Sequence, residues 1–170
     1  MQLTILKAAS AIVFGALISA AACAQQVGKP APAFDLPSTT TPNLRLVDLK
    51  GRVVLVDFWA SWCAPCKQSF PWMNEMQAKY GPQGLTIIGV NVDKKREDAD
   101  KFLAGTPAKF AVAFDTTGKV AQSYQPKGMP TSFLIGADGV VRNVHVGFRD
   151  SDRDDLELEL AAALAAATRK

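Results

Sequence analysis

The chain has 170 residues, 48% of them hydrophobic, and a formal net charge of +3. This length suits one domain that buries most of its apolar surface, and three cysteines are too few for a disulfide-stabilised framework. The nearly balanced charge gives no basic footprint for nucleic acid, and a single histidine excludes an intramolecular multi-histidine metal site.

Residues 1–24 have the organisation of an export signal. Lys7 precedes an apolar run over Ala8–Ile18, small residues follow, and Ala22-Cys23-Ala24 fits a cleavage site before Gln25. We therefore expect a signal peptide at 1–24 and a folded domain at 25–170. Two alternatives stay open, an uncleaved membrane anchor and a lipoprotein acylated at Cys23. All three place the folded domain outside the cytoplasm, and we expect it in the periplasm.

The remaining chain alternates strands and helices, which predicts an α/β or α+β fold with a mixed sheet. Val53–Trp59 is apolar apart from Asp57, as in a strand buried on both faces. Ser151 and Asp154 resemble a capping box at the start of the last helix. The expected strands are Phe34–Leu36, Leu44–Val47, Val53–Trp59, Leu85–Val92, Val112–Phe114, Thr131–Ile135 and Val140–Val146. The expected helices are Pro65–Tyr80, Glu97–Ala104, Gly118–Tyr124 and Ser151–Ala167.

Cys63 and Cys66 lie three residues apart where a buried strand passes into a helix. Such a pair forms a disulfide or a dithiol, and the free N–H groups and dipole of a helix N-terminus stabilise a thiolate on the first cysteine. We therefore predict that Cys63 is the nucleophile, that it forms a mixed disulfide with a substrate, and that Cys66 resolves it. A zinc site is disfavoured because it needs two more ligands, and only His145 and Cys23 remain.

Asp57 is the one carboxylate inside the apolar strand. Burying a carboxylate is costly unless it is protonated, paired or functional. We expect a buried acid with a raised pKa that exchanges protons with Cys66; an acid on an exposed strand edge is the alternative.

Met129-Pro130-Thr131 follows Lys127-Gly128 and begins a strand. A proline at this place is compatible with a cis peptide bond, or with a simple loop end.

With these motifs the chain resembles the thioredoxin superfamily. The segment from Val54 to Cys66 is similar to its active-site strand and helix start, and Gly128-Met129-Pro130-Thr131 to its cis-proline loop. The lead-in at 31–36 and the helix–strand–helix insert at 97–124 resemble the TlpA/ResA branch of exported thiol-disulfide oxidoreductases. The resemblance implies a thioredoxin-like mixed sheet flanked by helices, with short N-terminal strands and that insert.

The resemblance also implies roles for residues around the cysteines. Trp62 would shield the site, and Met129, Pro130 and Thr131 would bind an extended substrate segment, with a cis bond before Pro130. Cys63 and Cys66 carry over as the redox disulfide.

Four positions depart from the family pattern, and the first is Asp57, where branch members often have Asn. ResA-type proteins have a glutamate where this chain has Ser69, so any acid/base role passes to Asp57. The lysine partner that thioredoxins give this acid would fall near Gly89, and the glutamate of cytochrome-maturation relatives is replaced by Thr131.

The leading hypothesis is a periplasmic oxidoreductase that reduces disulfides of exported client proteins. Its electrons would come from a membrane thiol transporter, and no cofactor, metal or nucleic acid is expected. One alternative is a peroxiredoxin-like thiol peroxidase, which needs a threonine where this chain has Ala60. The other is a copper-delivery protein, which would need His145 beside the two thiolates.

Overall fold

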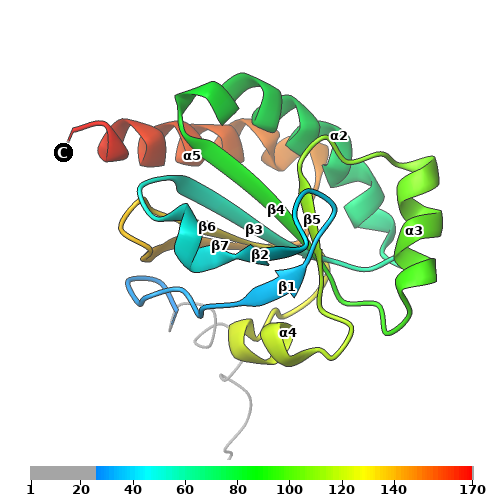
Figure 1. Cartoon of the computed structure of the whole chain (residues 1–170). Helices are drawn as coiled ribbons and strands as arrows, with labels where there is room; N and C mark the ends of the chain where they lie inside the picture. The colour runs from blue at the N-terminus through cyan, green and yellow to red at the C-terminus, as the bar shows by residue number, and fades with distance from the viewer. Residues whose placement is uncertain (1–25, 170) are drawn as a thin grey trace, which may run out of the picture.

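A five-stranded mixed sheet is the centre of the molecule, described for residues 26–169 in a computed structural model (Figure 1). The strand order is β5-β4-β3-β6-β7, with β3 and β4 parallel, β4 and β5 parallel, and the remaining neighbours antiparallel. β3 (Val53–Trp59) occupies the middle and is buried along its whole length, as its apolar sequence predicts.

Side chains along β3 point alternately to the two faces of the sheet, so the core consists of two clusters. Leu55 and Trp59 contribute to the cluster that α2 (Ala64–Tyr80) and α5 (Arg153–Ala167) also line. Val54, Val56 and Phe58 pack on the other face with Tyr124. Asp57 shares the parity of Leu55 and Trp59, so its side chain points to the face covered by α2.

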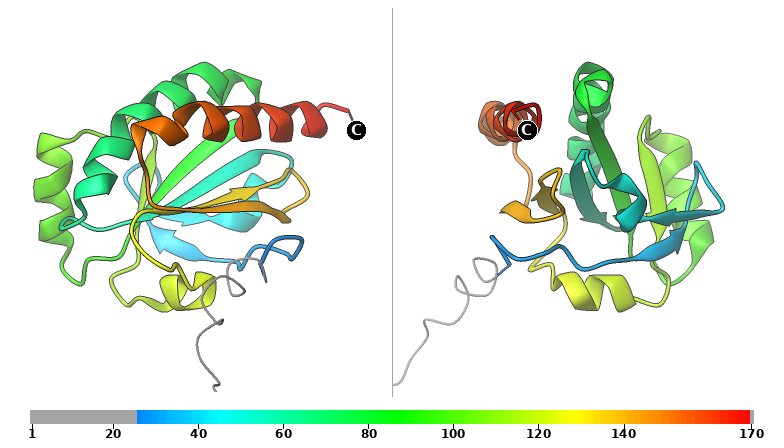
Figure 2. Two further views of the ribbon diagram at one scale, coloured as in Figure 1. Left: turned by 180° about the vertical axis from the view of Figure 1, so that it is seen from behind. Right: turned by 60° about the vertical axis from the view of Figure 1, so that its left-hand side comes forward.

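The helices form layers on the two sides of the sheet (Figure 2). α2 and α5 cover one face, and α4 and the β1–β2 pair lie under the other (Figure 1). The remaining elements are β1 (Asp35–Pro37), β2 (Asn43–Arg45), β4 (Leu85–Asn91), α3 (Arg96–Gly105), β5 (Ala111–Phe114), α4 (Lys119–Tyr124), β6 (Thr131–Ile135) and β7 (Val141–Val146). The predicted fold class is therefore confirmed, including the short N-terminal strands and the α3–β5–α4 insert.

Two local expectations were wrong. The second strand ends at Arg45, because Leu46–Leu49 turns into a 3₁₀ helix (η1) and Arg45 donates two hydrogen bonds to Asp48 across that turn. The last helix begins at Arg153, after a 3₁₀ turn at Asp150–Asp152 (η3).

Ser151 therefore does not cap the last helix. Its hydroxyl contacts Asp152 at 3.2 Å, and the Asp152 carboxylate accepts the Arg149 N–H at 3.1 Å. The 3₁₀ turn places Ser151 inside the turn, where its oxygen cannot reach the free N–H groups of α5.

Within residues 26–169, none of the helices is long and apolar enough to cross a membrane. The predicted signal peptide at 1–24 and the alternative acylation at Cys23 lie outside the described residues.

Candidate functional site: a cysteine pair at a helix start

Cys63 is the N-cap residue of α2 and is joined to Cys66 by a disulfide, with 5.3 Å between their Cα atoms. β3 ends at Trp59, and a turn closed by the Cys63 N–H and the Ala60 carbonyl at 3.1 Å leads into the helix. Pro65 stands in the first turn, where a missing N–H costs nothing. The strand-to-helix junction predicted from the sequence thus positions the pair.

The helix start acts directly on the sulfur of Cys63. The backbone N–H of Cys66 donates to Cys63 Sγ at 3.1 Å, and the first turn of α2 has no acidic residue. An N–H donor and the positive end of the helix dipole both stabilise negative charge on this sulfur. Cys63 is 4% exposed and Cys66 is fully buried, so Cys63 is the more accessible of the two.

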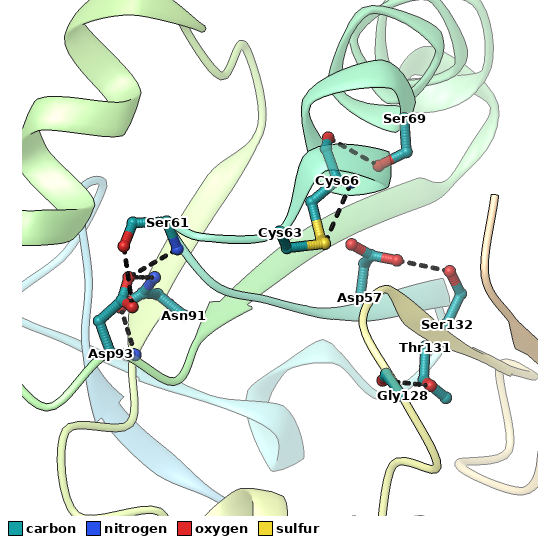
Figure 3. The surroundings of a disulfide bond; sticks show 10 residues. All are labelled: Asp57, Ser61, Cys63, Cys66, Ser69, Asn91, Asp93, Gly128, Thr131 and Ser132. Carbon is teal, nitrogen blue, oxygen red and sulfur yellow. Dashed lines mark hydrogen bonds between the residues drawn. A yellow bond between two sulfur atoms is a disulfide. The ribbon is translucent and has the colours of Figure 1, made fainter.

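Asp57 lies on the same side of the sheet as the disulfide and is 1% exposed (Figure 3). Desolvation by burial raises its pKa from 3.8 to about 7, against the opposing effect of a hydrogen bond from Ser132. One carboxylate oxygen, Oδ1, accepts the Ser132 hydroxyl at 2.5 Å. The other, Oδ2, has no hydrogen-bond partner among the described residues. The exposed-edge alternative for Asp57 is therefore wrong.

Ser132 was not singled out by the sequence analysis. β3 and β6 are antiparallel with Asp57 directly opposite Ser132, so the two side chains emerge on one face of the sheet. The available signal was a polar residue directly before the apolar run Phe133–Ile135. Only the strand register identifies Asp57 as its partner.

Gly89 is the residue of β4 opposite Asp57, and no cation stands there. A Cβ at position 89 would lie 3.0 Å from Phe110 Cε2 and 3.1 Å from Trp59 Nε1. The two aromatic side chains occupy the space that a lysine would need. The absence of the thioredoxin-type lysine partner thus has a steric reason.

A second polar cluster anchors the turn before Cys63 (Figure 3). Ser61 donates its backbone N–H to Asp93 Oδ2 at 2.9 Å and its hydroxyl to Asp93 Oδ1 at 3.0 Å. Asn91 Nδ2 also donates to Asp93, at 2.7 Å. Asn91 is the last residue of β4, and Asp93 lies two residues beyond it. Neither was predicted as a site residue; together they fix the turn at Ser61 to the end of β4.

The Met129–Pro130 peptide bond is cis, as the resemblance implied. The Thr131 hydroxyl donates to the Gly128 carbonyl at 2.8 Å, and Gly147 N–H donates to the Pro130 carbonyl at 2.8 Å. Thr131 is buried and Met129 half-buried. These bonds hold the loop beside the disulfide.

Trp62 is 72% exposed, the largest exposed fraction among the large hydrophobic residues described. It immediately precedes Cys63 on the surface of the turn.

Ser69 and His145 take no direct part in this geometry. Ser69 donates its hydroxyl to the Cys66 carbonyl at 3.0 Å and is buried in α2. His145 lies on β7, and its Nε2 is 3.5 Å from Asp152 Oδ2. Residues 26–169 contain no group of three potential metal-ligating side chains.

Two grooves differ in their relation to the cysteines. One of about 490 Å³ runs between α5 and the β6–β7 hairpin and contains none of the candidate residues. Another, of about 370 Å³, is lined by Ser61, Trp62 and Cys63 together with residues of α3. Of these two, the second is the one that can receive a substrate at Cys63.

Comparison with known proteins finds one family and several relatives named as thiol-disulfide oxidoreductases. The AhpC/TSA family model matches residues 27–144. The thiol-disulfide oxidoreductase ResA of Bacillus anthracis is 36% identical over 132 residues, covering 78% of this chain and 75% of the relative. ResA of Bacillus subtilis (strain 168) is 37% identical over 120 residues, covering 71% and 67%.

A solved structure is similar over most of the described fold. The crystal structure of a candidate thiol:disulfide interchange protein DsbE from Chlorobium tepidum has a TM-score of 0.79 and 54% identity. The match covers 81% of this chain and 97% of that one.

Proposed function

This chain belongs to the AhpC/TSA family and is a thiol-disulfide oxidoreductase of the ResA/DsbE type, and we propose that it reduces disulfides of client proteins in the periplasm. The observation that carries the proposal is the Cys63–Cys66 pair, with Cys63 at the N-terminus of α2 and a buried acid on the same side of the sheet. A stabilised thiolate and a nearby proton acceptor are what reduction of a disulfide requires.

The first step is attack of the Cys63 thiolate on one sulfur of the client disulfide. A bond forms between Cys63 Sγ and that sulfur, the client S–S bond breaks, and the second client sulfur leaves as a thiolate that takes a proton from water. Cys63 suits this role because it is the more exposed cysteine and receives the Cys66 N–H.

The second step is resolution by Cys66. Its thiol gives a proton to the Asp57 carboxylate, and the resulting thiolate attacks Cys63 Sγ. The Cys63–Cys66 disulfide forms, and the released client thiolate takes the proton back from Asp57. A group with a pKa of about 7 can accept and return this proton near neutral pH. The client gains two electrons and two protons in total.

Met129, Pro130 and Thr131 form the loop against which we expect the client segment to lie. The backbone N–H and carbonyl of Met129 enter no backbone hydrogen bond outside the regular elements of the described chain. An extended segment can use them by strand addition. Trp62, next to Cys63 in the sequence, offers an exposed apolar surface.

A protein that acts in the periplasm must be exported. Residues 1–24 act as a signal peptide, with acylation at Cys23 as an alternative way of retaining the protein at the membrane. Since each turnover leaves the pair oxidised, a membrane thiol transporter is the proposed electron donor.

Trapping the mixed disulfide tests the proposed function. With Cys66→Ser the second step cannot occur, so Cys63 should remain joined to its clients, which are then identified by mass spectrometry after purification from the periplasm. Cys63→Ser is the matched control and should retain none. Recovery of clients through Cys66 in the Cys63→Ser variant, or none in either, would contradict the assigned roles.

A further inference from the structure

The groove beside Cys63 is formed by the active-site turn and one side of α3. Its charged lining residues are both lysines, Lys67 from α2 and Lys101 from α3, and no carboxylate of the described chain lines it. Lys67 is one helical turn after Cys63, so it lies on the same side of α2. Any side chain that enters this groove next to Cys63 therefore meets positive charge.

These two cations are free to receive a ligand. Lys67 is exposed and makes no ion pair or side-chain hydrogen bond within residues 26–169. Lys101 approaches Asp98 at only 4.0 Å and its side chain is 80% exposed. Such an exposed pair contributes little free energy, so Lys101 can turn to another carboxylate at small cost.

The surroundings of the groove add to this charge. Asp93, which holds Ser61, is buried and uses both oxygens in hydrogen bonds, and it is followed by the exposed Lys94 and Lys95. On α3, Asp100 accepts a 2.8 Å hydrogen bond from Arg96. When Lys101 turns to a client, Asp98 and Glu97 are the two acidic side chains of α3 without an ion pair in the described chain, against the four exposed lysines Lys67, Lys94, Lys95 and Lys101.

The groove and the cis-proline loop lie on opposite sides of Cys63. Figure 3 places Ser61 and Asp93 on one side of the disulfide and Gly128 and Thr131 on the other. A client segment that pairs with the loop through its main chain would pass over Cys63 and continue towards α3. The residues next to the client cysteine would then reach Lys67 and Lys101.

We propose that this lysine-lined groove selects client segments that carry Asp or Glu within two residues of the reacting cysteine. The inference rests on the proposed reduction of client disulfides and names the class of segment that is reduced fastest. Charge complementarity of this kind acts on the rate of encounter and on the choice between partners.

The test uses three terminally blocked peptide disulfides that differ only in the residues flanking each cysteine: Asp and Glu, Asn and Gln, or Lys. Reduction by the fully reduced protein is followed by acid quench and mass measurement. Because flanking charges change the reactivity of the peptide itself, each rate is divided by the rate of the same peptide with dithiothreitol.

We expect the acidic peptide to react about 10-fold faster than the neutral one at about 20 mM salt, and less than about 2-fold faster at about 0.5 M. The double variant Lys67→Glu, Lys101→Glu should reverse the order of the acidic and basic peptides. Lys50→Glu is the matched control, because Lys50 is exposed and precedes the opposite end of β3; it should leave the order unchanged.

Equal normalised rates for the three peptides would overturn the inference, as would an acidic preference that survives in the double variant or is lost in Lys50→Glu. If no peptide is reduced at all, the proposed function fails instead, so the two failures are distinguishable.

Discussion

Asp57 and Ser132 show how burial and one hydrogen bond together set the pKa of a carboxyl group. Burial raises the pKa of Asp57, and the hydrogen bond from the Ser132 hydroxyl to Oδ1 lowers it; the net pKa is about 7. The net value is high because desolvation of a carboxylate outweighs one hydrogen bond from a neutral donor. In the proposed mechanism, Ser132 is a positioning residue, because its hydrogen bond lowers the pKa of Asp57 and keeps the acid ionisable near neutral pH.

The first prediction concerns stability. The native state holds a proton on Asp57 between pH 3.8 and about 7, whereas the unfolded state releases it. The free energy of unfolding of the oxidised protein should therefore fall as pH rises through this window, by up to about 4 kcal/mol from this group.

Asp57→Asn removes the free-energy cost of ionising a buried carboxyl group. The variant should be more stable than the wild type at about pH 8, and the difference should shrink towards pH 4, as measured by urea unfolding at both values. A stability difference independent of pH would show that Asp57 is not the group responsible.

The second prediction concerns Ser132→Ala. Without the hydrogen bond from Ser132, the pKa of Asp57 rises further. A smaller fraction of Asp57 is then ionised at neutral pH, so Cys66 has less of its proposed proton acceptor. Resolution of a Cys63 mixed disulfide should slow by about 5-fold at pH 7 and recover at higher pH.

Rapid-quench kinetics over a pH series and ¹³C NMR titration of the Asp57 carboxyl group measure this effect. Ser132→Thr keeps the hydroxyl and should restore the wild-type profile, while Ser123→Ala removes an exposed hydroxyl of α4 as a control. An unchanged pH profile in Ser132→Ala would exclude the positioning role.

At the level of elements, the packing of β3, α2 and α3 fixes the position of the candidate site. Trp59 at the end of β3 contacts Phe70 of α2, with ring centroids 5.1 Å apart, and Phe102 of α3 at 4.7 Å. Phe70 also contacts Phe110 at 5.1 Å. This aromatic cluster joins three elements behind the disulfide and fills the space opposite Gly89.

The third prediction is that Gly89→Ala destabilises the protein by about 1–3 kcal/mol. The added methyl group meets Phe110 and Trp59 at about 3 Å, and both side chains are confined by the cluster. Urea unfolding at constant pH measures the loss. Gly105→Ala is the control, since nothing lies within 4 Å of a Cβ there, and it should be neutral or slightly stabilising. Equal stability of the two variants would contradict the steric explanation for the glycine.

At the scale of the whole molecule, the folded domain has one central sheet with a hydrophobic core on each face. Both ends of the described chain pack against this sheet. Gly28 and Ala31 form backbone hydrogen bonds with Val141 and Gly139, so the lead-in is tied to the start of β7. The proposed cleavage point before Gln25 lies just ahead of this attachment. Removal of residues 1–24 should therefore leave the fold intact.

The fourth prediction follows for the mature protein. After export from a Gram-negative host, intact-mass measurement should show a chain that begins at Gln25. A chain that begins at an acylated Cys23 would instead support the lipoprotein alternative, and Cys23→Ala would then abolish the added mass. Recovery of the full chain with Met1 from the membrane would contradict both and support the uncleaved anchor.

Most of the fold was predicted from local sequence patterns. The apolar run of β3 and the proline near the start of α2 predicted a buried strand and a helix because such signals depend on neighbouring residues only. The ends of short elements were less accurate: η1 replaced the end of the second expected strand, and η3 displaced Ser151 from the helix cap. At these positions, tertiary packing and 3₁₀ turns compete with weak local preferences.

By itself, the sequence determined the candidate groups of the site: two cysteines at a helix start, one acid in an apolar strand and a proline before a strand, each recognisable from residues a few positions apart. Only the tertiary structure decided which groups act together. The antiparallel register of β3 and β6 gives Asp57 its Ser132 partner, and the parallel register of β3 and β4 places Gly89 and two aromatic rings where a cation could have stood. The folding of α3 against the active-site turn brings Lys101 to the groove of Lys67. Contacts between residues far apart in the chain depend on register and packing, which no local pattern specifies.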